Sequence, residues 1–215
     1  MPSFHDFRFL STDGKHNVFA RECTPDGEVR AVLQIAHGVA EHIYRYAPFM
    51  EFLAENGFVV VANDHLGHGK TAENEQELCF FAEKDGWNDV VSDMDTLHKL
   101  TAAKYPGVPY FLFGHSMGSF LTRTYIIDHP EGLKGVVISG TGQNPGAVIA
   151  AGKLMAKLEM IDNGPMYHSP TLDKLAFGSY NKKYDHVRTK LDWLTRDEAV
   201  VDAYIAVSYT HLRAH

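Results

Sequence analysis

Short apolar runs alternate with longer amphipathic segments along roughly the first 140 residues. The apolar runs have the length of buried strands and lie at 31–36, 58–62, 110–113 and 135–139. Between them, apolar residues recur every three or four positions, which predicts helices over 46–56, 85–105 and from 117 to just before Pro130. Strands that are apolar on both faces and alternate with helices are typical of a parallel sheet covered on both sides. The pattern therefore predicts an α/β protein with a doubly wound, mostly parallel sheet.

Two of the predicted helices have a defined apolar stripe. In the segment 85–105 the stripe contains Trp87, Val90, Val91, Met94, Leu97 and Leu100. The aspartates of this segment lie in its N-terminal half, where the helix dipole favours negative charge: Asp85, Asp89 and Asp93. In the segment after position 116 the stripe contains Met117, Phe120, Leu121, Thr124 and Tyr125. Each stripe lies on one face of its helix.

The most specific motif is Gly114-His115-Ser116-Met117-Gly118, which lies between the strand 110–113 and the helix that follows. A G-x-S-x-G sequence in this context is typical of a nucleophile elbow, a strained turn that presents a serine hydroxyl above the sheet. Gly114 and Gly118 fit this interpretation because side chains two residues either side of the serine would collide. Ser116 also follows the carboxyl end of a strand, where parallel sheets bind their ligands. We therefore predict that Ser116 is a catalytic nucleophile.

The two ends of the chain depart from the alternating pattern. Residues 4–20 alternate loosely and contain Asp13-Gly14, a hairpin turn signal, which predicts an antiparallel pair at the sheet edge. From Gln143 the strand signal disappears: 147–161 and 196–207 have a helical pattern, and 165–185 is expected to be irregular. We interpret 1–142 as the core and 143–206 as a helical cap inserted over the active site, since long inserted segments are often lids. Further packing helices are the alternative.

Two more motifs accompany the elbow. His37-Gly38-Val39-Ala40-Glu41-His42 follows the strand 31–36, and Asp64-His65-Leu66-Gly67-His68-Gly69 follows the strand 58–62. In this order and spacing, the three motifs resemble the monoacylglycerol lipase and lysophospholipase branch of the α/β-hydrolases, from about residue 15 to residue 206. The resemblance implies a serine hydrolase that needs no cofactor, acts on single-chain acyl esters and has an acyl tunnel in its cap. It also implies an oxyanion hole made by the backbone N–H groups of Val39 and Met117, with His37 and Gly38 shaping the loop.

The sequence lacks a recognisable acid and histidine that could act together with Ser116. The resemblance implies an acid and then a histidine after the cap, but nothing there reads as an apolar strand. None of the histidines beyond the elbow is in the family position: His129, His168, His186, His211 and His215. The segment 207–215 resembles translated sequencing-adaptor sequence, with a divergent natural terminus as the alternative. We expect a C-terminally truncated chain without the last strands and helices or the triad acid and histidine. We expect such a chain to be a poor catalyst and its full-length parent to be a competent esterase. We also expect strand 135–139 to form an exposed apolar edge of the sheet.

The composition and net charge of the chain limit the classes of partner that it can bind. The formal net charge of −7 argues against nucleic acid and provides no attraction to anionic membranes, so lipid contact would be peripheral and through the cap. Two cysteines, Cys23 and Cys79, lack metal-ligand spacing and form no disulfide framework. With neither a secretion signal nor a membrane-spanning run in the sequence, we expect a cytoplasmic protein.

Several alternatives remain open. Asp64, His65 and His68 have side chains that bind metals, but no third ligand pair stands out, so no metal is expected. Glu41 and His42 are expected to support the oxyanion loop rather than transfer protons, and His115 to pack. A general carboxylesterase, a peptidase or an acyltransferase would share the same motifs, whereas dehalogenases and epoxide hydrolases need a carboxylate in place of Ser116. A non-catalytic lipid-binding fragment is the alternative outside the enzymes.

Overall fold

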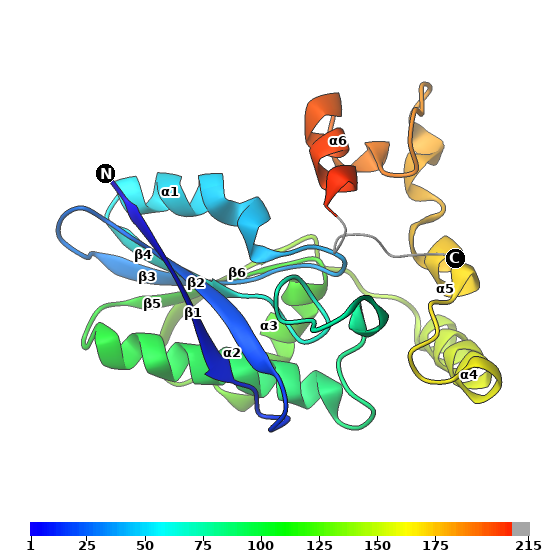
Figure 1. The fold of residues 1–215 in the computed structure, drawn as a ribbon, viewed down its shortest axis with the longest axis horizontal. Helices are drawn as coiled ribbons and strands as arrows, with labels where there is room; N and C mark the ends of the chain where they lie inside the picture. Colours follow the sequence, from blue (N-terminus) through cyan, green and yellow to red (C-terminus); the bar gives the residue numbers. More distant parts are fainter. Residues whose placement is uncertain (208–215) are drawn as a thin grey trace. The chain divides into compact units, whose positions relative to one another are not determined.

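A computed structural model describes residues 1–207 and divides the chain into two compact units, residues 1–142 and the residues from Gln143 onward (Figure 1). The first unit contains a six-stranded sheet with the order β1-β2-β4-β3-β5-β6. Its strands are β1 (Ser3–Leu10), β2 (Asn17–Thr24), β3 (Ala31–Ala36), β4 (Phe58–Asn63), β5 (Tyr110–His115) and β6 (Leu133–Ser139). The last four are parallel to one another, whereas β2 is antiparallel to both of its neighbours, β1 and β4. The predicted mostly parallel sheet is confirmed.

Three helices cover the two faces of this sheet. They are α1 (Ala47–Glu55), α2 (Gly86–Lys104) and α3 (Met117–Asp128). Figure 1 shows α1 on one face and α2 and α3 on the other. Successive strand residues alternate between the two layers: Leu33 and Val60 pack with Met50 of α1, whereas Val32 and Val59 pack with Leu97 of α2. Both faces are therefore buried, which is why the central strands are apolar throughout.

The buried stripes of α2 and α3 are narrower than the sequence pattern predicts. Trp87 and Leu100 of α2 are 37% and 49% exposed, and Phe120 of α3 is 40% exposed, so these three members of the apolar stripes are partly in contact with solvent. In α3 the buried face is rotated towards Gly118 and Thr122. The rotation follows from close backbone packing at Gly118, described below, which sets how α3 lies on the sheet.

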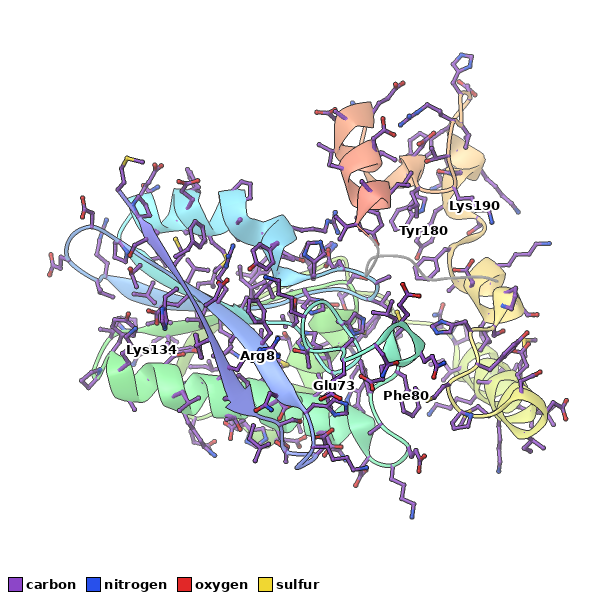
Figure 2. All side chains as sticks on the ribbon, viewed as in Figure 1. Arg8, Glu73, Phe80, Lys134, Tyr180 and Lys190 are labelled. Atoms are coloured by element: carbon purple, nitrogen blue, oxygen red, sulfur yellow. The ribbon has the colours of Figure 1, made fainter. Side chains whose placement is uncertain are left out.

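Asp93 does not act through the helix dipole alone, because it holds the turn of the β1–β2 hairpin. Its two carboxylate oxygens accept hydrogen bonds from the Ser11 hydroxyl (2.7 Å) and from the Thr12 backbone N–H (2.7 Å) and hydroxyl (2.9 Å). Arg8 of β1, labelled in Figure 2, donates to the Asn17 carbonyl (2.7 Å) and to the Lys70 carbonyl (2.9 Å). The hairpin is thus attached both to α2 and to the loop after β4.

The second unit is helical in its described part. It contains α4 (Gly146–Asn163), α5 (Pro170–Phe177) and α6 (Glu198–Ala206), with 3-10 turns at Tyr180–Lys183 and Asp192–Leu194. The expectation of an irregular segment over 165–185 is wrong at α5, where the Ser169 hydroxyl accepts from the Leu172 N–H (2.9 Å) and Pro170 occupies the first turn. Serine followed by proline is a helix-start signal. Apart from Val207, the segment 207–215 lies outside the described residues.

None of the helices in residues 1–207 is long and apolar enough to cross a bilayer.

Strand β6 is an edge of the sheet that could promote aggregation. Among residues 1–207 it pairs only with β5, and Val137 at its centre is 52% exposed. An open apolar edge strand is a template for pairing between chains, and lysine at such an edge prevents it. We expect Val137→Lys to raise the concentration at which the chain aggregates, measured by light scattering, without lowering its unfolding temperature. Val200→Lys on α6 adds the same charge away from the edge, and an equal improvement in that variant would contradict the prediction.

Candidate active site

Ser116 occupies a strained turn between β5 and α3. Its backbone has φ 52° and ψ −119°, a conformation that L-residues rarely adopt. The Ser116 N–H donates to the Ser139 carbonyl at the end of β6 (2.9 Å), and the Ser116 carbonyl accepts from the Ser119 N–H (2.9 Å) and hydroxyl (2.6 Å). These bonds hold the turn from both sides. The serine is therefore presented at the carboxyl end of the central strands rather than inside a helix.

The two glycines of the elbow are required by close backbone packing. A Cβ atom on Gly118 would stand 2.0 Å from the Ala36 carbonyl oxygen, and one on Gly114 would stand 2.4 Å from the Gly118 carbonyl oxygen. Both positions exclude any side chain, because backbone atoms are in the way at each of them, together with the Thr122 side chain at Gly114. The absence of these side chains lets α3 begin directly against the end of β3.

The loop after β3 packs against Ser116. A Cβ on Gly38 would lie 3.1 Å from the Ser116 Cβ, so the glycine backbone lies directly beside the serine. The following residues turn sharply, with Ala40 at φ 54°. Within residues 1–142, no acceptor receives the backbone N–H of Val39 or that of Met117. For Met117 this is expected, since it begins α3 and the first N–H groups of a helix have no intrahelical acceptor.

Buried histidines connect this loop to the loop after β4. The fully buried His37 contacts the Gly38 carbonyl through Nδ1 (2.7 Å) and accepts the His65 N–H at Nε2 (3.1 Å). These partners require the neutral form with the proton on Nδ1, which donates to Gly38. The His37 ring lies 4.2 Å from the His65 ring and 5.3 Å from the His68 ring, centre to centre. Burial and the two neighbouring histidines hold the pKa of His37 well below its usual value.

Asp64 fastens the two loops together. One carboxylate oxygen accepts the Ile43 N–H and the other accepts the Lys70 N–H, each at 2.8 Å. Burial raises the pKa of Asp64 to about 6, although both N–H groups oppose the shift. Among residues 1–207, no three histidine, cysteine, aspartate or glutamate side chains are grouped so that they could hold a metal ion. In the structure, Asp64 is thus a loop-closing carboxylate.

Within residues 1–142, no proton acceptor is in contact with Ser116. In residues 1–142 the Ser116 hydroxyl has no hydrogen-bond partner. Its neighbour His115 is half-buried and lies 3.3 Å from the Ser139 hydroxyl through Nδ1. His129 follows the far end of α3, where its Nδ1 is 3.7 Å from Asp95. His168 and His186 belong to the second unit, and His211 and His215 lie outside the described residues.

The motifs predicted Glu41 as a support of the loop 38–43, but they did not reveal its partners. Glu41 is buried and pairs with Arg45, four residues on, and also accepts the Tyr46 hydroxyl (2.8 Å). The Glu–Arg spacing of four was a usable signal for this pair. No such signal marks the hydrogen bond that the Tyr44 hydroxyl donates to Asp6 of β1 (2.8 Å), because the two residues are far apart in the sequence.

Comparison with known proteins gives a consistent result. The model of the family described as "Serine aminopeptidase, S33" matches residues 27–214. Monoglyceride lipase of Mus musculus is 32% identical over 129 residues, which cover 60% of this chain and 40% of that protein. Monoacylglycerol lipase of Mycolicibacterium smegmatis is 32% identical over 140 residues, covering 63% and 48%. This chain therefore spans about half the length of the curated relatives it matches.

Solved structures agree over nearly the whole chain. A thermostable carboxyl esterase from Bacillus coagulans in complex with glycerol superposes with a TM-score of 0.87 at 30% identity, covering 98% of this chain and 67% of that one. A lipase in its open form superposes with a TM-score of 0.81 at 28% identity, covering 99% and 68%. Both likenesses extend over the first and the second unit.

The buried histidines generate a prediction about acid stability. Burial lowers the pKa of His65 to about 3 and that of His68 to about 4, against 6.5 for an exposed histidine. Between these values the unfolded chain binds more protons than the folded one, so stability present above pH 6.5 is lost as the pH falls through this window. Asp64 acts in the opposite direction between pH 3.8 and about 6, but it is one group against the three histidines.

We therefore expect His68→Gln to flatten the pH dependence of the free energy of unfolding between pH 6.5 and pH 4.5. Urea unfolding followed by Trp87 fluorescence, in a Trp193→Phe background, reports the first unit alone. His5→Gln removes an exposed histidine of β1 and serves as the control. Equal slopes in the two variants would show that the buried histidines do not set the acid limit.

Proposed function

Because the chain belongs to the serine aminopeptidase S33 family of α/β-hydrolases, we propose that it is the nucleophile-bearing part of a serine esterase. Its substrates are carboxylic esters of single-chain lipids, such as monoacylglycerols or lysophospholipids. The reaction passes through an acyl-enzyme on Ser116. The observation that carries the proposal is the strained turn at Ser116, packed against Gly38. The backbone N–H groups of Val39 and Met117, which follow Gly38 and Ser116 in the chain, have no acceptor within residues 1–142.

The first chemical step uses these groups directly. The Ser116 hydroxyl oxygen attacks the ester carbonyl carbon, and the carbonyl oxygen becomes an oxyanion that accepts the Val39 and Met117 N–H groups. Collapse of this intermediate releases the alcohol and leaves the acyl group on Ser116, and water then releases the fatty acid. Donors fixed before the reaction stabilise the developing charge, and the loss of one typically reduces the rate by ~10²–10³.

The proton of Ser116 needs an acceptor that residues 1–142 do not provide. A serine hydroxyl is a weak nucleophile at neutral pH without an adjacent base. We propose that residues 1–215 alone are a slow catalyst, which retains only the ~10³–10⁴ over water that an oxyanion hole and binding supply. We propose that this chain contains neither the triad acid nor the triad histidine.

The second unit is proposed to be the cap that receives the acyl chain. Leu154, Leu158 and Ile161 of α4 are exposed, and none of the residues of α4 is buried. Such a helix offers apolar surface to a fatty-acyl chain and to the surface of a lipid aggregate. The names of the relatives, monoglyceride lipase and monoacylglycerol lipase, favour a single-chain lipid. A general carboxylesterase, a peptidase and an acyltransferase of the same fold are the alternatives.

The proposal predicts that an added base restores acylation. With a p-nitrophenyl ester of a short fatty acid, imidazole should accelerate release of p-nitrophenol by the chain at least tenfold beyond its effect on the ester alone, and intact-mass spectrometry should find one acyl group. Ser116→Ala should abolish this increment. Ser92→Ala removes a half-buried serine of α2 as a matched control and should retain it. If Ser116→Ala retains the increment, Ser116 is not the nucleophile. If the unaltered chain shows no increment, the protein is a non-catalytic fragment.

A further inference from the structure

Glu41 places a buried carboxylate inside the loop that packs against Ser116. Its side chain is almost fully enclosed, and one oxygen, Oε1, accepts both the Gly38 N–H (2.5 Å) and the Tyr46 hydroxyl (2.8 Å). The other oxygen, Oε2, pairs with the Arg45 guanidinium. Hydrogen bonds to an ionised acceptor are among the strong ones in proteins. Glu41 therefore bonds to the loop before it and to the 3-10 turn Ile43–Tyr46 after it.

The bond to Gly38 decides which N–H groups of the loop are available. Gly38 is the residue that lies against Ser116, yet its N–H is held by Glu41. The next N–H along the chain, that of Val39, has no acceptor within residues 1–142. Successive N–H groups of a tight turn can converge on a single anion. With the Gly38 N–H held by Glu41, Val39 provides the free donor.

Glu41 also stabilises a turn that would otherwise be unfavourable. Ala40 has φ 54°, and a non-glycine residue in the left-handed region persists only where its surroundings enforce it. At the far end of the turn, Asp64 accepts the Ile43 N–H. The segment 38–43 is thus fixed by one buried carboxylate within it and a second one outside it.

The Glu41 carboxylate is tied to the sheet through Tyr46. Burial, together with Glu41, raises the pKa of Tyr46, so its hydroxyl stays protonated and donates. The Tyr46 ring packs edge-on against Phe113 of β5, 6.5 Å between ring centres. Phe113 lies on the strand that carries Ser116 at its end. This contact gives the carboxylate a rigid support in the strand next to the nucleophile.

We propose that Glu41 is a positioning residue for the oxyanion hole: by holding the Gly38 N–H it fixes the turn that presents the Val39 N–H to the acyl oxygen on Ser116. This inference rests on the proposed function. Glu41 does not act as the base for Ser116, because its two oxygens are engaged by Gly38, Tyr46 and Arg45. Its contribution is geometric, and it should appear in the acylation rate rather than in substrate affinity.

Glu41→Gln tests this assignment, with Glu22→Gln as a matched control. Glu22 is equally buried and pairs with Lys104 (2.5 Å), but it lies on β2 and forms no hydrogen bond or ion pair with residues 38–43. In imidazole-assisted acylation, we expect Glu41→Gln to lower kcat at least tenfold with KM changed less than twofold. Glu22→Gln should reduce thermal stability while leaving kcat unchanged. Equal kcat in the two variants would overturn the proposal, since Glu41 would then be a structural carboxylate only.

A second measurement does not depend on catalysis. In the ¹⁵N-labelled chain, the Gly38 amide proton should resonate far downfield because of its short bond to a carboxylate. Glu41→Gln should move it upfield and speed its exchange with solvent, whereas Glu22→Gln should do neither. An unchanged Gly38 resonance in Glu41→Gln would overturn the proposal. Absence of any Ser116-dependent acylation in the unaltered chain would instead overturn the proposed function and the catalytic role of Glu41 with it, even if the resonance moved as expected.

Discussion

The close approach of the α3 backbone to the end of β3 is the constraint on which the site depends. Gly118 packs directly on the Ala36 carbonyl, and this contact is available only to a residue without a side chain. Because α3 begins so near the sheet, Ser116 must turn through a strained conformation to connect β5 to it. The bond from the Ser116 N–H to Ser139 at the end of β6 offsets part of that strain. The elbow and the position of the serine are therefore consequences of one packing requirement.

Around this turn, buried polar groups determine the shape of two loops. His37, Asp64 and Glu41 each bond to backbone N–H or C=O groups of the loops after β3 and β4. Buried polar groups are costly when unpaired and rigid when satisfied, so such a network specifies one arrangement. The same burial gives the histidines their lowered pKa values and makes the loops sensitive to acid. Rigidity at neutral pH and loss of stability in acid have the same physical origin.

The periodicity of the sequence was sufficient for the sheet and most of the helices, because burial on one or both faces leaves a regular pattern. The periodicity did not predict features that depend on a local helix-start signal or on contacts between residues distant in the sequence. Helix α5 begins at a Ser169–Pro170 signal within a segment rich in polar and aromatic residues, and the orientation of Phe120 depends on packing at Gly118. The motifs identified Ser116 and its loop as candidates from residue types alone. Partners such as Tyr46 for Glu41, or Ser11 for Asp93, required the folded structure, since spacing does not encode them.

A crystal structure of the chain after reaction with an alkyl fluorophosphonate would show whether Ser116 faces an oxyanion hole. We expect phosphorus bonded to the Ser116 hydroxyl oxygen, with the phosphoryl oxygen about 3 Å from both the Val39 and the Met117 backbone nitrogen atoms. In that structure the Gly38 N–H should still donate to Glu41. An adduct on another residue, or a phosphoryl oxygen directed away from these two nitrogen atoms, would rule out this site.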